Sequence, residues 1–179
     1  MSRPEITAEL SRRLEKYIDP HNDPRIYWAK EVTFDYASGE TKRVDYMRYK
    51  PLNNSVSGIE KGDFYCYEIK SGVEDFHSKN GHNFLGDFNY YVMREDVYEQ
   101  IKDQIGFAIG VLVPDKFSGL KVVRKARRRD RSRPTSEMLL MMWRSTRREI
   151  AKQRRKENAQ AEQNDENSGA NQLLLLNSL

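Results

Sequence analysis

The order of predicted elements indicates an α/β protein with a mixed β-sheet flanked by helices. Two segments of strand-like alternation flank a five-residue loop, 37–41, that contains a glycine, and this arrangement predicts a β-hairpin. A third strand follows, and helical and strand-like segments then alternate toward the C-terminus. The resulting order is α-β-β-β-α-β-α-β-β-α.

The first helix is predicted from apolar spacing. Ile6, Leu10, Leu14 and Ile18 recur every four residues, which is typical of an amphipathic helix over 4–18. Ser2 and, three residues later, Glu5 have the spacing of a capping box.

The strands are predicted where apolar or β-branched residues alternate with polar ones between Gly, Asn, Asp or Pro. They are expected at 26–36, 42–49, 64–70, 87–93, 107–113 and 119–124. In the first, the even-numbered apolar residues from Ile26 to Tyr36 are assigned to one face. A weak, irregular helical pattern covers 72–83, and a short helix is expected at 95–104.

The C-terminal part begins at Pro134, which breaks the chain. A basic helix over 135–157 is expected to bury a stripe that includes Met142 and Trp143. Residues 158–171 are low in complexity and rich in Asn and Gln. We therefore predict a domain over 1–134, a helix over 135–157 and a disordered tail over 158–179.

The charge is unevenly distributed. The 179 residues carry a formal net charge of +4, yet 121–133 holds eight Lys or Arg against the single acid Asp130. A basic block on an otherwise acidic chain favours a polyanionic partner, most simply nucleic acid. The alternative is a solvated linker with no partner.

The sequence gives no indication of export or membrane insertion. Cys66 is the single cysteine, so an internal disulfide and a cysteine-based zinc cage are excluded. The N-terminal residues lack an apolar signal segment, and the apolar run Leu173 to Leu176 is too short for a bilayer. We expect a cytoplasmic protein, in a bacterium or in the host of a phage.

The strongest chemical signal is the triplet Glu68-Ile69-Lys70 in the third strand. Side chains two apart on a strand share a face, so the carboxylate and the ammonium project together. Asp45, on the preceding strand, can reach the same place. Two carboxylates and a lysine can hold a hard divalent metal beside a phosphate. The alternative is an exposed salt-bridge cluster on the sheet.

These residues resemble a known nuclease superfamily. Arg43-Val-Asp45, Tyr67-Glu-Ile-Lys-Ser71, Asp75-Phe76 and Asn89-Tyr-Tyr-Val-Met93 look like the motifs of PD-(D/E)XK nucleases. The resemblance is nearest to MmcB-like DNA repair endonucleases and phage-borne relatives. It implies a restriction-endonuclease-like core, α-β-β-β-α-β. Val44 stands where the motif has its proline, and many members share this departure.

The resemblance also implies site residues. Asp45, Glu68 and the backbone carbonyl of Ile69 would be ligands of Mg²⁺ or Mn²⁺, and Glu9 on the first helix would be an additional acid. Lys70 would orient the attacking water or stabilise charge on the phosphate. The implied activity is metal-dependent DNA cleavage in repair, replication or recombination.

The basic block is the expected nucleic-acid contact. Its cationic residues are Arg124, Lys125, Arg127, Arg128, Arg129, Arg131 and Arg133. Two alternatives remain. The chain is either a non-catalytic nucleic-acid-binding or replication-accessory module with a nuclease-like fold, or an RNA-binding protein in which the arginine-rich segment is the functional part.

The end of the chain contains a possible docking peptide. Gln172-Leu-Leu-Leu-Leu176 resembles the motif by which bacterial replication proteins bind the sliding clamp. A flexible tether would raise its effective concentration there. The alternative is a frayed end, or a segment that folds back on the body.

Overall fold

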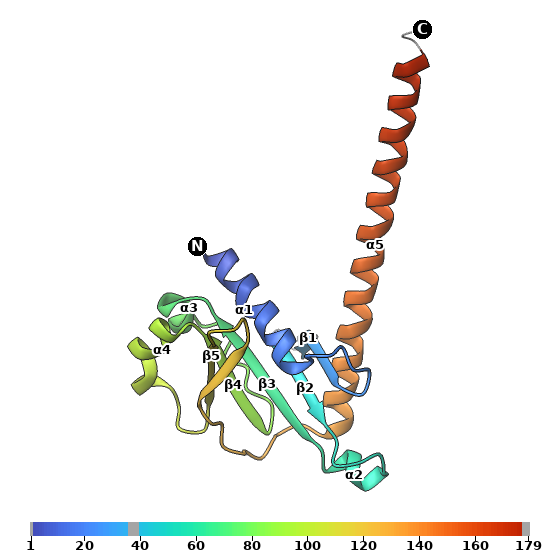
Figure 1. The fold of residues 1–179 in the computed structure, drawn as a ribbon. Coiled ribbons are helices and arrows are strands. Elements are labelled where there is room, and N and C mark those ends of the chain that lie inside the picture. Colours follow the sequence, from blue (N-terminus) through green and yellow to red (C-terminus); the bar gives the residue numbers. More distant parts are fainter. Residues whose placement is uncertain (1, 36–39, 177–179) are drawn as a thin grey trace. The chain divides into compact units, whose positions relative to one another are not determined.

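The computed structural model describes the backbone of residues 2–35 and 40–176 and the side chains of residues 2–35 and 40–161. The chain divides into two units, Met1–Ser145 and Thr146–Leu179. The first unit is an α/β domain with a six-stranded mixed sheet (Figure 1). It includes the first turns of the C-terminal helix, so the unit extends beyond the boundary predicted at residue 134.

The sheet follows the chain order, β1-β2-β3-β4-β5-β6. The β1–β2, β2–β3 and β5–β6 pairs are antiparallel, whereas β3–β4 and β4–β5 are parallel. The strands are β1 (Tyr27–Phe34), β2 (Lys42–Lys50), β3 (Asp63–Lys70), β4 (Phe88–Met93), β5 (Gly110–Pro114) and β6 (Leu120–Arg124).

Along the chain, the helices precede, separate or follow these strands. They are α1 (Arg3–Ile18), α2 (Val56–Glu60), α3 (Val73–His77), α4 (Glu95–Ile101) with the 3₁₀ turn η1 (Lys102–Gln104), and α5 (Thr135–Leu176). The sequence predicts a loop where α2 forms, and it predicts a longer helix than α3. The backbone N–H of Ser2 donates to Glu5 Oε2 at 2.6 Å, as a capping box requires.

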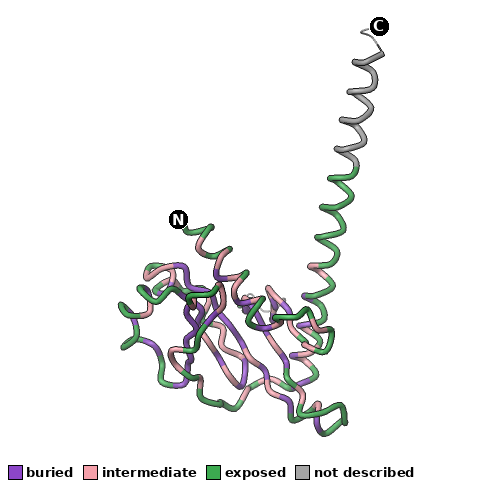
Figure 2. Tube along the Cα trace, in the orientation of Figure 1, coloured by how far each residue is buried: buried purple, intermediate pink, exposed green. Residues whose placement is uncertain are grey.

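The core occupies both faces of the sheet. Leu10, Leu14 and Ile18 of α1 pack against Tyr46 and Tyr67 on one face. On the other face, the beginning of α5 covers β1 and β2, and α3 and α4 cover β4 and β5. Figure 2 shows the buried residues concentrated along the strands. Cys66 is fully buried in this core.

Strand β1 changes face at Glu31, which has a positive φ of 56°. Before it, Trp28 packs with the α1 side of the sheet, and after it Val32 and Phe34 pack with the α5 side. The prediction that one face carries all the even-numbered apolar residues is therefore wrong. An irregularity at one residue reverses the alternation that follows.

Helix α5 differs from the prediction at two points. Its buried positions in the first unit are Thr135, Met138, Met142 and Ser145, whereas Trp143 is 65% exposed, so Trp143 does not belong to a buried stripe. The backbone also stays helical to Leu176, beyond the end predicted at residue 157. Side chains from residue 162 onward, including the expected clamp peptide 172–176, lie outside the described residues.

No helix in the described part of the chain is long and apolar enough to cross a membrane.

Candidate active site

The candidate site lies where β2 and β3 separate. Their ladder runs from Lys50 opposite Asp63 to Tyr46 opposite Tyr67. Asp45 and Glu68 are the next residues on each strand, and the backbone N–H of Ile69 donates to Asp45 Oδ2 at 2.9 Å. Beyond the last paired residues, the carboxylate of Asp45 therefore replaces a backbone carbonyl of β2 as the acceptor for an N–H of β3. Asp45 and Ile69 also line a cavity at this point.

Glu68 is the most unusual residue of the site. It is fully buried, and neither carboxylate oxygen has a hydrogen-bond partner that satisfies normal geometry. Burial and then the neighbouring charge of Asp45 raise the pKa of Glu68 to about 9, against the opposing effect of Lys70. A buried carboxylate without partners is costly, so this side chain holds a proton at neutral pH.

The pKa values of Asp45 and Lys70 are both shifted in the direction that favours the neutral form of the side chain. Burial is the largest cause for both: it raises the pKa of Asp45 and lowers the pKa of Lys70. The Ile69 N–H opposes the first shift, and the carboxylates of Asp75, Glu68 and Asp45 oppose the second. Perturbed titrating groups that converge on one cavity are typical of functional sites.

The ammonium of Lys70 is positioned by the segment that follows α3. Its Nζ donates to the carbonyl of Asn80 at 2.6 Å and to that of Asp75 at 3.1 Å. Lys70 is 1% exposed, and no ion pair joins it to Glu68 within the part of the chain that is described. The alternative of an exposed salt-bridge cluster is therefore wrong, because both side chains are buried.

The segment 80–83 closes the opening between the strands. Asn83 Nδ2 donates to the carbonyl of Arg43 on β2 at 2.9 Å. Gly81 adopts a positive φ of 69°, and a Cβ there would lie 2.9 Å from Lys70 Nζ and 3.2 Å from Glu68 Oε2. A residue with a side chain here would have to adopt the positive φ and displace the end of Lys70 or Glu68, so glycine is favoured. Gly81 lies in the irregular segment 72–83, and no signal in the sequence indicates its contact with the site.

A cavity of about 590 Å³ lies over these residues. Asp45, Ile69 and Lys70 line it together with the cationic side chains of Arg3 and Arg43. Arg3 Nη2 lies 2.7 Å from Asp75 Oδ1, and Arg43 Nε lies 3.0 Å from Glu31 Oε2. Three cationic side chains and the acids Asp45 and Asp75 therefore line one cavity, which offers groups for an anion and for a cation.

Glu9 does not join the site. It pairs with Arg13 within α1, whose Leu10 and Leu14 pack on the face of the sheet occupied by Tyr67 and Ile69. Glu68, which neighbours both residues on β3, points to the opposite face. Among the described side chains, no group of three or more His, Cys, Asp or Glu comes together as metal ligands would. The chain therefore offers two carboxylates here.

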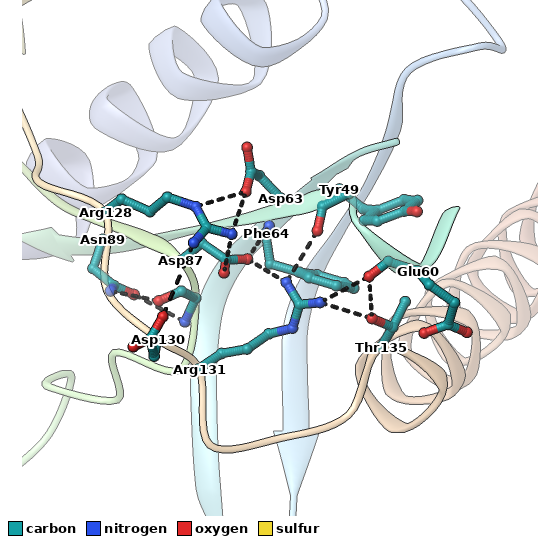
Figure 3. Close-up of polar contacts among 12 residues, drawn as sticks. Tyr49, Glu60, Asp63, Phe64, Asp87, Asn89, Arg128, Asp130, Arg131 and Thr135 are labelled. Carbon is teal, nitrogen blue, oxygen red and sulfur yellow. Dashed lines mark hydrogen bonds and ion pairs between the residues drawn. The ribbon is translucent and has the colours of Figure 1, made fainter. Parts of the chain in front are cut away.

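Much of the basic block has intramolecular partners (Figure 3). Arg131 reaches the buried carboxylate of Asp87 at 2.6 Å, and Arg128 lies 3.5 Å from the same group. Asp87 also accepts the backbone N–H of Phe64 at 2.8 Å. Arg133 pairs with Asp35 and Glu137. These arginines fasten the segment between β6 and α5 to the domain.

Other members of the block have no acidic partner within the described residues. These are Arg124, which donates to the carbonyls of Ile105 and Gly106, and the exposed Lys125, Arg127 and Arg129. Arg128 contacts Asp63 at the amino-terminal end of β3, whereas Lys70 ends the strand. The step of seven residues from Asp63 to Lys70 spans about 23 Å at ~3.3 Å per residue.

No family model and no curated protein matches the chain. A solved structure that is similar is described as the SPO1766 protein of unknown function from Silicibacter pomeroyi, with a TM-score of 0.58 and 18% sequence identity. The match covers 83% of this chain and 90% of that one. At this identity the similarity concerns the fold alone.

Proposed function

We propose that the protein is a metal-dependent nuclease that hydrolyses phosphodiester bonds in DNA, with Asp45, Glu68 and Lys70 at its active site. The observation that carries the proposal is the pair of buried, unpartnered oxygens of Glu68 beside Asp45 and Lys70. Such an arrangement destabilises the metal-free site, and a divalent cation would neutralise it.

The residues fit Mg²⁺ or Mn²⁺. Both ions prefer oxygen ligands, and Mg²⁺ is commonly held by one or two carboxylates, with water and substrate phosphate completing its shell. Asp45, Glu68 and the carbonyl of Ile69 would supply the protein ligands. When bound, the ion would lower the pKa of a bound water and neutralise charge on the phosphate.

The cationic side chains would act on the substrate. Lys70 lines the cavity together with Asp45, so its ammonium would stabilise negative charge that develops on the phosphate or orient the attacking water. Arg3 and Arg43 line the same cavity and would hold the neighbouring phosphates. Burial keeps Lys70 fixed, so little reorganisation accompanies the reaction.

The arrangement of strands supports a restriction-endonuclease-like core. Three antiparallel strands, a helix and a strand parallel to the third follow α1, as the resemblance to PD-(D/E)XK nucleases implies. Asp45 lies on the second strand and the Glu68–Lys70 triplet on the third. Repair, replication and recombination are the processes in which such an activity would act.

A second candidate is a non-catalytic nucleic-acid-binding module of the same fold. The observation that favours it is the segment 80–83, which packs against Glu68 and holds Lys70 through a backbone carbonyl. In a nuclease this segment must leave room for substrate and ion. In a binding module it would stay closed, and the cavity would bind phosphate alone.

Cleavage assays separate the two candidates. The wild type should nick supercoiled plasmid in Mg²⁺ or Mn²⁺ and not in EDTA, while Glu68→Gln and Lys70→Met remain folded and inactive. Glu99→Gln and Lys102→Met, on the exposed pair 2.8 Å apart at α4 and η1, are matched controls that should cleave normally. Full activity in Glu68→Gln, or no cleavage by the wild type with either ion, would contradict the proposed site.

A further inference from the structure

Phe107 is an exposed aromatic residue beside the basic segment. It lies in the loop before β5, is 73% exposed and has the guanidinium of Arg127 over its ring at 5.6 Å from the centroid. A surface depression of about 520 Å³ is formed at this place by residues 106–109 and 127–129. Its lining combines an aromatic face with arginine side chains.

The loop that carries Phe107 is fixed from several directions. Arg124 donates to the carbonyls of Ile105 at 3.1 Å and Gly106 at 3.0 Å. The backbone N–H of Arg127 donates to the carbonyl of Ala108 at 3.0 Å. The aromatic ring is thus presented on a rigid support, which reduces the entropic cost of binding a ligand.

Three arginines line the depression around Phe107: Arg128, which pairs with Asp63 and Asp87, and Arg127 and Arg129, which have no acidic partner among the described residues. Arg128 and Arg131 neutralise Asp87, but Lys125, Arg127 and Arg129 are exposed and pair with no acid in the described ranges. One part of the block therefore anchors the segment, and the other offers positive charge beside an aromatic ring. This combination is the one by which proteins bind single strands, through phosphate contacts and base stacking.

The depression is separate from the candidate active site. Arg128 lines the depression and lies 3.3 Å from Asp63, the residue before Phe64 at the start of β3. Lys70 is six residues beyond Phe64 along β3, or about 20 Å at ~3.3 Å per residue. Figure 1 shows that the segment between β6 and α5 passes the ends of the strands that lie away from α3.

We propose that Phe107, with Arg127 and Arg129, forms a stacking site for an unpaired base of a DNA strand whose phosphodiester is held at the active site. The inference rests on the proposed nuclease function and adds to it a preference for substrates that carry single-stranded DNA. The base stacks on the open face of Phe107, and Arg127 and Arg129 contact the flanking phosphates.

Binding measurements test this site without cleavage. In the Glu68→Gln protein with EDTA, fluorescence anisotropy would compare a labelled short oligothymidylate with a blunt duplex. Phe107→Ala should weaken oligothymidylate binding by roughly 5- to 150-fold, the effect of one lost stacked base, and change duplex binding little. Phe107→Tyr, which keeps an aromatic face, should bind as the parent does.

Two controls separate the site from general effects. Phe117→Ala removes another phenylalanine, 86% exposed, in the β5–β6 turn, and should bind normally. Arg129→Gln should reduce the slope of log affinity against log salt by about 0.7, the value for one single-strand phosphate contact. Lys121→Gln, from an exposed pair with Glu95, should leave that slope unchanged.

The outcomes distinguish this inference from the nuclease proposal. Unchanged oligothymidylate affinity in Phe107→Ala, in a protein whose wild type cleaves plasmid, would refute the stacking site alone. Strong binding through Phe107 in a protein that never cleaves would refute the nuclease and leave the stacking site standing.

Discussion

Substituting Glu68 by glutamine should make the metal-free protein more stable at alkaline pH. Glu68 has a pKa of about 9 in the folded protein, compared with 4.5 for the unperturbed group. Its folded pKa is raised, so between these values the folded state binds more protons than the unfolded state and stability falls as pH rises. Glutamine does not titrate, so the stability of Glu68→Gln does not fall with pH for this reason.

The magnitude follows from the size of the shift. Each pH unit between the two pKa values costs about 1.4 kcal/mol, so the wild type loses about 3 kcal/mol between pH 5.5 and pH 8 through Glu68. Titrating groups that do not interact with Glu68 are common to both proteins and cancel in the difference. Relative to the wild type, Glu68→Gln should therefore gain about 3 kcal/mol over this range.

Urea unfolding in EDTA at the two pH values would measure this difference. Glu99→Gln, a neutralising change on the exposed face of α4, is the matched control and should show no such pH dependence. Saturating Mn²⁺ should stabilise the wild type and not Glu68→Gln, because a ligand of the folded state adds to its stability. A difference between wild type and Glu68→Gln that does not change with pH would refute the assignment of a buried, protonated carboxyl.

Three further results are expected. Asp87→Ala should lower the free energy of unfolding by about 3–5 kcal/mol, because it removes the acidic partner of Arg131 and the acceptor of the Phe64 N–H. Urea unfolding measures this loss, with the exposed Asp103→Ala as control. Gly81→Ala should cost about 1–2 kcal/mol for its positive φ and reduce Mn²⁺-dependent cleavage. Gly72→Ala, where no atom lies within 4 Å of the added Cβ, should do neither, and equal cleavage by both variants would contradict the role of segment 80–83. Burial raises the pKa of Cys66 to about 12, so its thiol should react with a disulfide reagent only as fast as the protein unfolds; rapid reaction of the native protein would show that the core is open.

The strands and their order along the chain could be predicted because the sequence signals for strands are local. Alternation and turn residues located all six strands, and the i, i+2 spacing placed Glu68 and Lys70 on one face. The expectation that Asp45 reaches the same place depended only on the pairing of neighbouring strands. These features follow from backbone geometry within a few residues.

The features that could not be predicted depend on distant contacts. Asp87 neutralises Arg131 from a distance of 44 residues in the chain, and neither neighbourhood in the sequence indicates the other. The sequence therefore did not indicate that Arg128, Arg131 and Arg133 of the basic block form ion pairs within the domain. The positive φ of Glu31, which reverses the exposure of β1, likewise has no signature in the surrounding sequence.

The fit of segment 80–83 over the acids was also beyond sequence reasoning. It depends on the conformation of Gly81 and on the hydrogen bond that Lys70 Nζ donates to the carbonyl of Asn80. A glycine in a polar loop has many ordinary explanations, so its presence alone does not predict contact with a buried carboxylate.

The most direct test of the account is the rate of Mn²⁺-dependent plasmid nicking by purified wild type and Glu68→Gln, measured together with Glu99→Gln. If Glu68 is a metal ligand of the nuclease site, the wild type and Glu99→Gln cleave, and Glu68→Gln, although folded, does not. Equal rates in all three proteins would show that the carboxylate of Glu68 takes no part in hydrolysis and would contradict the central claim.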